Sequence, residues 1–181
     1  MRMNYFNSGI FVFLMLFHFS AGAQQQYIII GWNDLGMHCS NKDFSKLVIL
    51  PPYNNIRAQV IRVGDDQNLP VIETTGFKVT YEIPGNTYSV GKTNFWDYED
   101  KLFGQNLEPN IGLTGAGLSG DMSINENYFY VDGVPLTPYQ DADLQHEDPY
   151  QLGLLRVYSG SGALLASTQP VIPVSKRNKL R

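Results

Sequence analysis

Residues 77–83 read Phe-Lys-Val-Thr-Tyr-Glu-Ile, and this stretch decides the fold class. Its apolar side chains stand at every second position, Phe77, Val79, Tyr81 and Ile83, and a charged or hydroxyl-bearing residue separates each pair. Successive side chains of a β-strand point to opposite faces of the sheet. The pattern therefore predicts a strand with one buried and one exposed face.

Further strands are expected on both sides of this stretch. Residues 56–63 alternate in the same way, so Arg57, Gln59 and Ile61 should share one face. Residues 27–31 are a compact apolar run and predict a buried first strand. The other predicted strands lie at 69–73, 128–131, 151–158 and 163–168.

The segments between these strands indicate how they connect. Residues 74–76 predict a hairpin between the strands on either side, residues 132–133 a turn, and the Ser-Gly-Ser-Gly stretch 159–162 a second hairpin. Short strands without alternating helices favour a mostly β fold. We expect an immunoglobulin-like β-sandwich over residues 24–175, with long loops and one short helix.

The helix is predicted over residues 93–104, with Phe95, Tyr98 and Leu102 on one face and Gly104 at its end. Aromatic residues make up 13% of the chain, and several of them lie in or near this segment and the loop after the first strand. In β-sandwiches the loops at one end commonly carry the function, so we expect these segments to lie together.

Residues 32–43 and the glycine-rich stretch 112–120 predict long loops. The glycine spacing lacks the Gly-Lys-Ser/Thr ending of a phosphate-binding loop. A loop that passes close to another backbone explains these glycines better than nucleotide binding does.

The first 23 residues have the pattern of a cleavable secretory signal peptide. Arg2 supplies the positive start, residues 10–19 the apolar stretch, and Ala21-Gly22-Ala23 the small residues of a cleavage site. We expect an exported protein, periplasmic or secreted, that is not held in a membrane after cleavage. Residues 176–181 are expected to be a short basic tail.

Charge and cysteine content exclude two classes of function. Without Arg2 the chain has 12 basic against 17 acidic residues, hence a net charge of −5 and no basic stripe, which argues against nucleic-acid binding. The chain has one cysteine and no Cys-x-x-Cys-His motif, so no covalent haem is expected on it.

The densest group of chemically active side chains is Met37-His38-Cys39. Thioether, imidazole and thiolate groups suit copper or haem iron, so this group is a candidate metal site. Burial of His38 and Cys39 as packing residues is the structural alternative. A third hypothesis is a cysteine-dependent enzyme in which His146 serves Cys39 as the base.

The strings GWNDLGMHC (31–39), NFWDY (94–98), GLTGAGLSG (112–120) and ASTQPVIPVS (166–175), among others in the same order, resemble a group of large exported bacterial proteins described as multihaem-cytochrome-like. In that group this type of region precedes segments with Cys-x-x-Cys-His. The resemblance implies an N-terminal β domain whose electron transfer belongs to a haem-bearing continuation or a separate redox partner.

Together these observations predict an exported, non-enzymatic β-sandwich module that binds a redox protein partner. The residues expected at its binding end are Trp32, Asn33, Asp34, Asp43, Trp96 and Tyr98.

Overall fold

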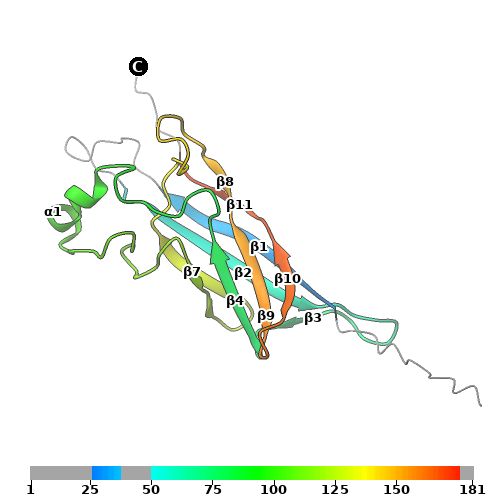
Figure 1. The fold of residues 1–181 in the computed structure, drawn as a ribbon. Helices are drawn as coiled ribbons and strands as arrows, with labels where there is room; N and C mark the ends of the chain where they lie inside the picture. Colours follow the sequence, from blue (N-terminus) through cyan, green and yellow to red (C-terminus); the bar gives the residue numbers. More distant parts are fainter. Residues whose placement is uncertain (1–25, 38–49, 176–181) are drawn as a thin grey trace, which may run out of the picture.

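The computed structural model describes residues 26–37 and 50–175, so the predicted signal peptide, Cys39 and the basic tail lie outside the described residues. Two antiparallel sheets face each other (Figure 1). Sheet A contains β1 (Tyr27–Met37), β2 (Tyr53–Arg62), β3 (Val71–Glu73), β6 (Ser123–Ile124) and β7 (Phe129–Val134). Sheet B contains β4 (Phe77–Glu82), β5 (Ser119–Asp121), β9 (Leu154–Ser159) and β10 (Leu164–Thr168). The fold is the predicted mostly β, immunoglobulin-like sandwich with long loops and one short helix.

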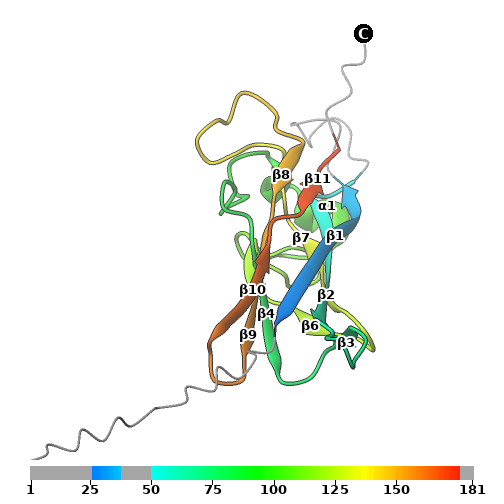
Figure 2. The same cartoon turned by 90° about the vertical axis from the view of Figure 1, so that its right-hand side faces the viewer.

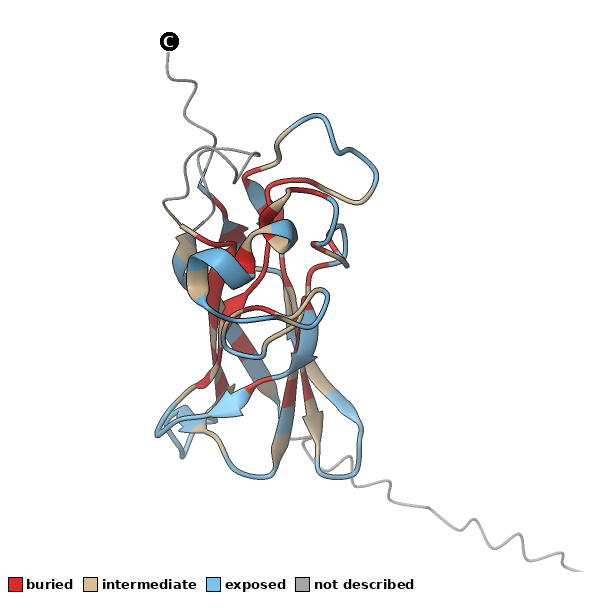
Figure 3. Ribbon diagram, turned by 90° about the vertical axis from the view of Figure 1, so that its left-hand side faces the viewer, coloured by how far each residue is buried: buried red, intermediate tan, exposed pale blue. Residues whose placement is uncertain are grey.

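The hydrophobic core lies between the two sheets. Figure 3 shows buried residues along the strands and in the connections at one end, whereas the turns at the opposite end are exposed. The predicted alternation of 77–83 is confirmed, because Val79, Tyr81 and Ile83 are all at least 96% buried. The side chains on the inward face of β2 are buried to the same extent. The fully buried side chains of the central strands are Ile56, Ala58, Val60, Leu155 and Val157.

The long connections within the described ranges gather at one end of the sandwich (Figure 1). A small sheet of β8 (Tyr150–Leu152) and β11 (Val171–Pro173) lies at this end, together with the helix α1 (Glu99–Phe103). Figure 2 shows β1 running alongside β10 and β11, which closes that side of the sandwich. None of the helices in the described ranges is long and apolar enough to cross a membrane.

The predicted hairpin between residues 69–73 and 77–83 is wrong. β3 pairs with β2, where Ile72 lies opposite Ile61, and β4 pairs with β5 and β9. The turn at 74–76 therefore carries the chain from sheet A to sheet B instead of joining neighbours. The apolar residues of β3 stay largely exposed at the edge of sheet A, whereas the apolar row of β4 is buried in the core, and the local turn pattern does not contain this information. The hairpin of β9 and β10 is confirmed.

The first strand is longer and less buried than predicted. β1 includes residues 32–37, which the sequence assigned to a loop, and a bulge between Asn33 and Leu35 interrupts its pairing with β2. Ile29 is buried, but Ile28 and Ile30 are 48% and 49% exposed. A continuous apolar run was interpreted as burial on both faces, whereas this strand covers the core with one face only.

Two smaller predictions also need correction. Asp132 and Gly133 lie within β7 instead of forming a turn, and Gly133 has a φ of 71°, which fits a strand irregularity. The predicted helix is divided into a 3-10 turn, Phe95–Asp97, and the five-residue α1, which ends at Gly104 as expected. Leu102 is exposed, and Phe103 packs against Phe95 in its place.

Candidate functional site

The outer face of sheet A is the side that points away from the core. The strand register fixes its composition, because directly paired residues point to the same side. One row joins Ile28, Ile61 and Ile72 across three strands. A second row joins Trp32, Arg57 and Tyr130. The residues of this face are Ile28, Ile30, Trp32, Asp34, Arg57, Gln59, Ile61, Ile72, Tyr128, Tyr130 and Asp132.

This face is more apolar than the solvent side of a sheet usually is. Ile28, Ile30 and Trp32 follow one another along β1 with exposures of 48%, 49% and 36%, and Ile72 on β3 is 44% exposed. Antiparallel sheets with one wet side normally place polar residues there. Large contiguous apolar patches on a protein surface mark interaction sites, so this face is the first candidate for binding.

Arg57 lies at the centre of the outer face. Its Nε is 2.9 Å from Oδ2 of Asp34 and its Nη1 is 2.5 Å from Oδ1 of Asp132, so one guanidinium joins β1 to β7 across β2. The rings of Tyr128 and Tyr130 lie 5.9 and 5.6 Å from its Cζ. A half-buried arginine between two carboxylates and two aromatic rings is held in one position, so the face is rigid at its centre.

The predicted binding residue Asn33 has a structural role instead. Its Nδ2 donates to Oδ1 of Asn54 and to the carbonyl of Asn55 in the neighbouring strand. Asn54 in turn donates to the carbonyl of Pro173 in β11. Gly36 completes this contact, because a Cβ there would lie 2.1 Å from the Pro173 carbonyl oxygen. The Asn-Asp-Leu-Gly stretch therefore fastens β1 to its neighbours, while Trp32 and Asp34 face outward.

Trp96 and Tyr98 lie in a separate aromatic cluster. Phe95 is buried at its centre, and the ring of Trp96 meets it edge-on at 5.2 Å between centroids. The remaining members are Tyr98, Phe103 and Leu107. These aromatic residues anchor the segment of α1 through their own packing, and within the described residues no ring contact joins them to Trp32.

His38, Cys39 and Asp43 lie outside the described residues, and of Met37 only the backbone in β1 is described. Among the residues that are described, no three His, Cys, Asp or Glu side chains come together to hold a metal ion. His146 is 83% exposed and pairs with Asp143 at 2.8 Å. The metal and cysteine hypotheses therefore stay predictions.

Metal analysis of the mature protein tests the first of them. If Met37, His38 and Cys39 hold copper or iron, protein purified without a histidine tag should contain metal in stoichiometric amount. The double variant His38→Ala, Cys39→Ser should lose it, while His146→Ala should keep it as the matched control. Wild-type protein that takes up neither metal would contradict the hypothesis.

No sequence pattern indicated a buried lysine, yet Lys92 is completely buried. Its Nζ donates to Oδ1 of Asn86 at 2.7 Å, to the carbonyl of Tyr139 at 2.8 Å and to Oδ1 of Asp141 at 2.5 Å. The ring of Tyr88 lies 4.3 Å from the same atom. We call these five residues the Lys92 cluster. It joins the connection after β4 to the one after β7.

Two pKa shifts characterise the Lys92 cluster. Burial lowers the pKa of Lys92, and the nearby Asp141 offsets this only in part. For Asp141, burial alone would raise the pKa, but hydrogen bonds from Lys92 and from Thr87 outweigh it and the pKa is lowered. The carboxylate of Asp141 thus faces a buried cation, although its own side chain is 29% exposed.

Asn86 connects the Lys92 cluster to further buried polar groups. Asn86 is completely buried, and its Nδ2 donates to the carbonyl of Thr137 at 2.7 Å and to Oε1 of Gln151 at 3.0 Å. No sequence pattern connects Asn86, Lys92 and Asp141, because all three lie in irregular stretches and Asp141 is 49 positions from Lys92. Only the packing of two distant connections brings them together.

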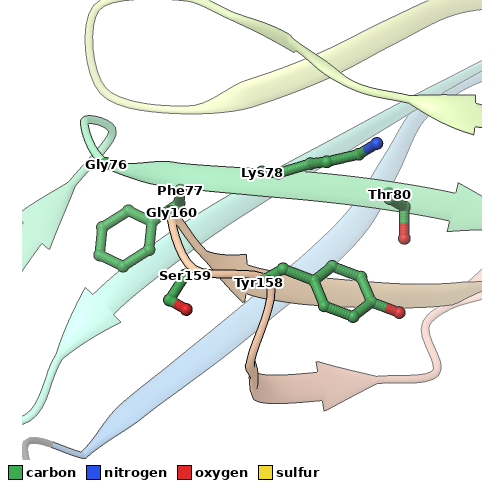
Figure 4. A pocket seen from close by; sticks show the side chains of 8 residues that line it. Gly76, Phe77, Lys78, Thr80, Tyr158, Ser159 and Gly160 are labelled. Atoms are coloured by element: carbon green, nitrogen blue, oxygen red, sulfur yellow. The ribbon is translucent and has the colours of Figure 1, made fainter.

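Two open grooves of similar size lie among the described residues. One, of about 570 Å³, lies on sheet B at the end away from α1, and Phe77, Lys78 and Tyr158 line it (Figure 4). The other, of about 500 Å³, lies between β5 and β7 beneath the glycine-rich loop, with Asp121 and Asp132 in its wall.

The predicted close approach of the glycine-rich loop is confirmed. A Cβ on Gly112 would lie 2.1 Å from the carbonyl oxygen of Gly133. The hydroxyl of Tyr81 donates to the carbonyl of Gly117 at 3.0 Å, and burial raises the pKa of Tyr81 to about 12. The loop is thus fixed against both sheets.

Comparisons with protein-family models, with curated proteins and with solved structures found no match for this chain. The functional argument therefore depends on the outer face of sheet A and on the Lys92 cluster.

Proposed function

We propose that this chain is an exported, non-enzymatic β-sandwich module that binds a haem-bearing redox protein through the outer face of sheet A. The observation that carries the proposal is the exposed apolar row of Ile28, Ile30 and Trp32, which continues across the sheet to Ile72. Two of the residues predicted for binding, Trp32 and Asp34, lie on this face.

Shape and rigidity support binding over catalysis. The centre of the face is held by the Arg57 ion pairs and by two tyrosine rings. A preorganised surface loses little conformational entropy when a partner binds. Large apolar side chains around a fixed arginine are also the residues that dominate the free energy of protein interfaces.

Charge indicates what the partner surface should look like. The carboxylates of Asp34 and Asp132 are 41% and 35% exposed at the margin of the apolar row. The mature chain is acidic by the count of its charged residues. The complementary surface is therefore an apolar patch with basic groups at its rim.

Site-specific photocross-linking in the producing organism tests this proposal. The photoreactive residue p-benzoylphenylalanine replaces Trp32 on the outer face of sheet A, and Tyr158 on sheet B as the matched aromatic control. We expect the Trp32 position alone to give an adduct that stains for haem and yields peptides with Cys-x-x-Cys-His. A haem-free protein, a second copy of this chain, no adduct, or equal adducts from both positions would overturn the proposal.

A further inference from the structure

We propose that Lys92 forms a covalent amide bond with the side chain of Asn86, in a self-catalysed reaction assisted by Asp141. This inference concerns the interior of the protein and does not depend on the proposed function.

The two reacting groups are already in contact. Nζ of Lys92 lies 2.7 Å from Oδ1 of Asn86, and both residues are completely buried. Because a C=O bond is about 1.23 Å long, Nζ lies no more than about 4 Å from the amide carbon of Asn86. Reaction geometries begin at about 3 to 3.5 Å, so a small rotation of the Asn86 amide suffices for attack.

The environment favours the nucleophilic form of the lysine. Nζ has no exposure to solvent, and the ring of Tyr88 covers it at 4.3 Å. Burial disfavours the ammonium and therefore favours the neutral amine, which is the nucleophile. The Asp141 side chain is 29% exposed and connects the buried Nζ to solvent, so it provides a route for the proton that leaves.

The reaction balances without any other reactant. From the neutral amine, one Nζ proton passes to the Asp141 carboxylate as the Nζ–Cγ bond forms. Asp141 returns this proton to Nδ2 as the Cγ–Nδ2 bond breaks. The products are a secondary amide between Lys92 and Asn86 and one molecule of ammonia, and Asp141 ends as it began. The Thr137 carbonyl and Gln151 Oε1 hold the leaving nitrogen at 2.7 and 3.0 Å.

Asn86 is a better acyl donor than Asp141, although both contact Nζ. An ionised carboxylate repels a nucleophile and has no good leaving group, whereas the amide of Asn86 is neutral. Amides resist amines in water, but fixed orientation is worth an effective concentration of about 10⁵ to 10⁸ M, and a positioned acid–base group contributes about 10² to 10⁴ more.

Peptide mass analysis of the folded, purified wild-type chain tests the proposal. Trypsin normally cleaves after lysine, so an unmodified chain gives a peptide that ends at Lys92. The cross-linked chain should instead give peptide 79–101, uncut at Lys92 and lighter than its sequence mass by one ammonia. Its fragment spectrum should lack breaks between residues 86 and 92. The resistance to cleavage separates the bond from a cyclised asparagine or N-terminal glutamine, which also lose ammonia.

Two variants assign the roles. Lys92→Arg keeps the positive charge but removes the nucleophile, so it should restore cleavage after residue 92. Asp141→Asn keeps both reacting groups and should leave most of peptide 79–92 unmodified. Wild-type protein that is fully cut after Lys92 would overturn the proposal. A peptide lighter by one water and joined to the segment that contains Asp141 would overturn the assignment to Asn86.

Discussion

Replacement of Lys92 by methionine is expected to lower the free energy of unfolding by about 3 kcal/mol. Methionine fills a similar volume, but it leaves Oδ1 of Asn86 and the carbonyl of Tyr139 without the donor they have now. Removing one partner of a buried ion pair typically costs about 3 to 5 kcal/mol, and the partial exposure of Asp141 favours the lower value. This figure is for the unreacted chain, in which Lys92 keeps its charge; in the cross-linked chain the amide bond would take the place of the ion pair.

Urea unfolding followed by tryptophan fluorescence measures this loss, and Lys78→Met is the matched control. Lys78 also pairs with an aspartate, Asp121, at 3.1 Å, but the two side chains are 59% and 64% exposed. Exposed ion pairs contribute about 0 to 1 kcal/mol, so the control should unfold almost like the wild type. If both variants lost the same small amount, the Lys92 cluster would not be a stabilising contact.

Gly112→Ala is expected to destabilise the protein by about 3 kcal/mol or more. The new methyl group would lie 2.1 Å from the carbonyl oxygen of Gly133. Backbone atoms of β7 cannot move away as the end of a flexible side chain can. The glycine-rich loop must therefore lift, which also breaks the hydrogen bond from Thr114 Oγ1 to the carbonyl of Asp132.

Gly117→Ala, in the same loop, is the control for this prediction. The nearest atom to a Cβ at that position is 3.5 Å away, which is ordinary van der Waals contact. Its effect on urea unfolding should stay within about 0.5 kcal/mol. Hydrogen exchange should also show faster opening of residues 112–120 in Gly112→Ala alone. Equal stability of the two alanine variants would show that the close approach to Gly133 does not constrain the loop.

The sequence predicted the positions of the strands better than it predicted which strands pair with each other. Alternation identified β2, β4 and the hairpin of β9 and β10, because one period describes both a strand and the side it buries. The strand at 69–73 was also predicted, but the turn at 74–76 suggested β4 as its partner, whereas β3 pairs with β2. Which strand becomes a neighbour depends on the layer that buries its apolar row, and a local pattern does not contain this information.

The candidate site was predicted only in part. Trp32 and Asp34 were expected in a loop and lie instead on an exposed sheet face. They lie next to Arg57, for which the alternation of residues 56–63 predicts the same face as Gln59 and Ile61. Asn33, at the bulge of β1, instead donates a hydrogen bond from its side-chain amide to the backbone carbonyl of Asn55 in β2. Residues with similar side chains and adjacent numbers thus differ in role, because successive residues of a strand point to opposite sides.

By itself, the sequence determined the mostly β composition, the positions of the regular strands and the need for glycine at the loop that passes Gly133. These properties depend on periodicity and on side-chain size, which are local. Only the tertiary structure decided that the apolar rows of β1, β2 and β3 form one exposed face. Likewise, only the packing of connections about 50 residues apart brought Lys92 to Asn86 and Asp141, because burial of a charge is a property of all the atoms around it.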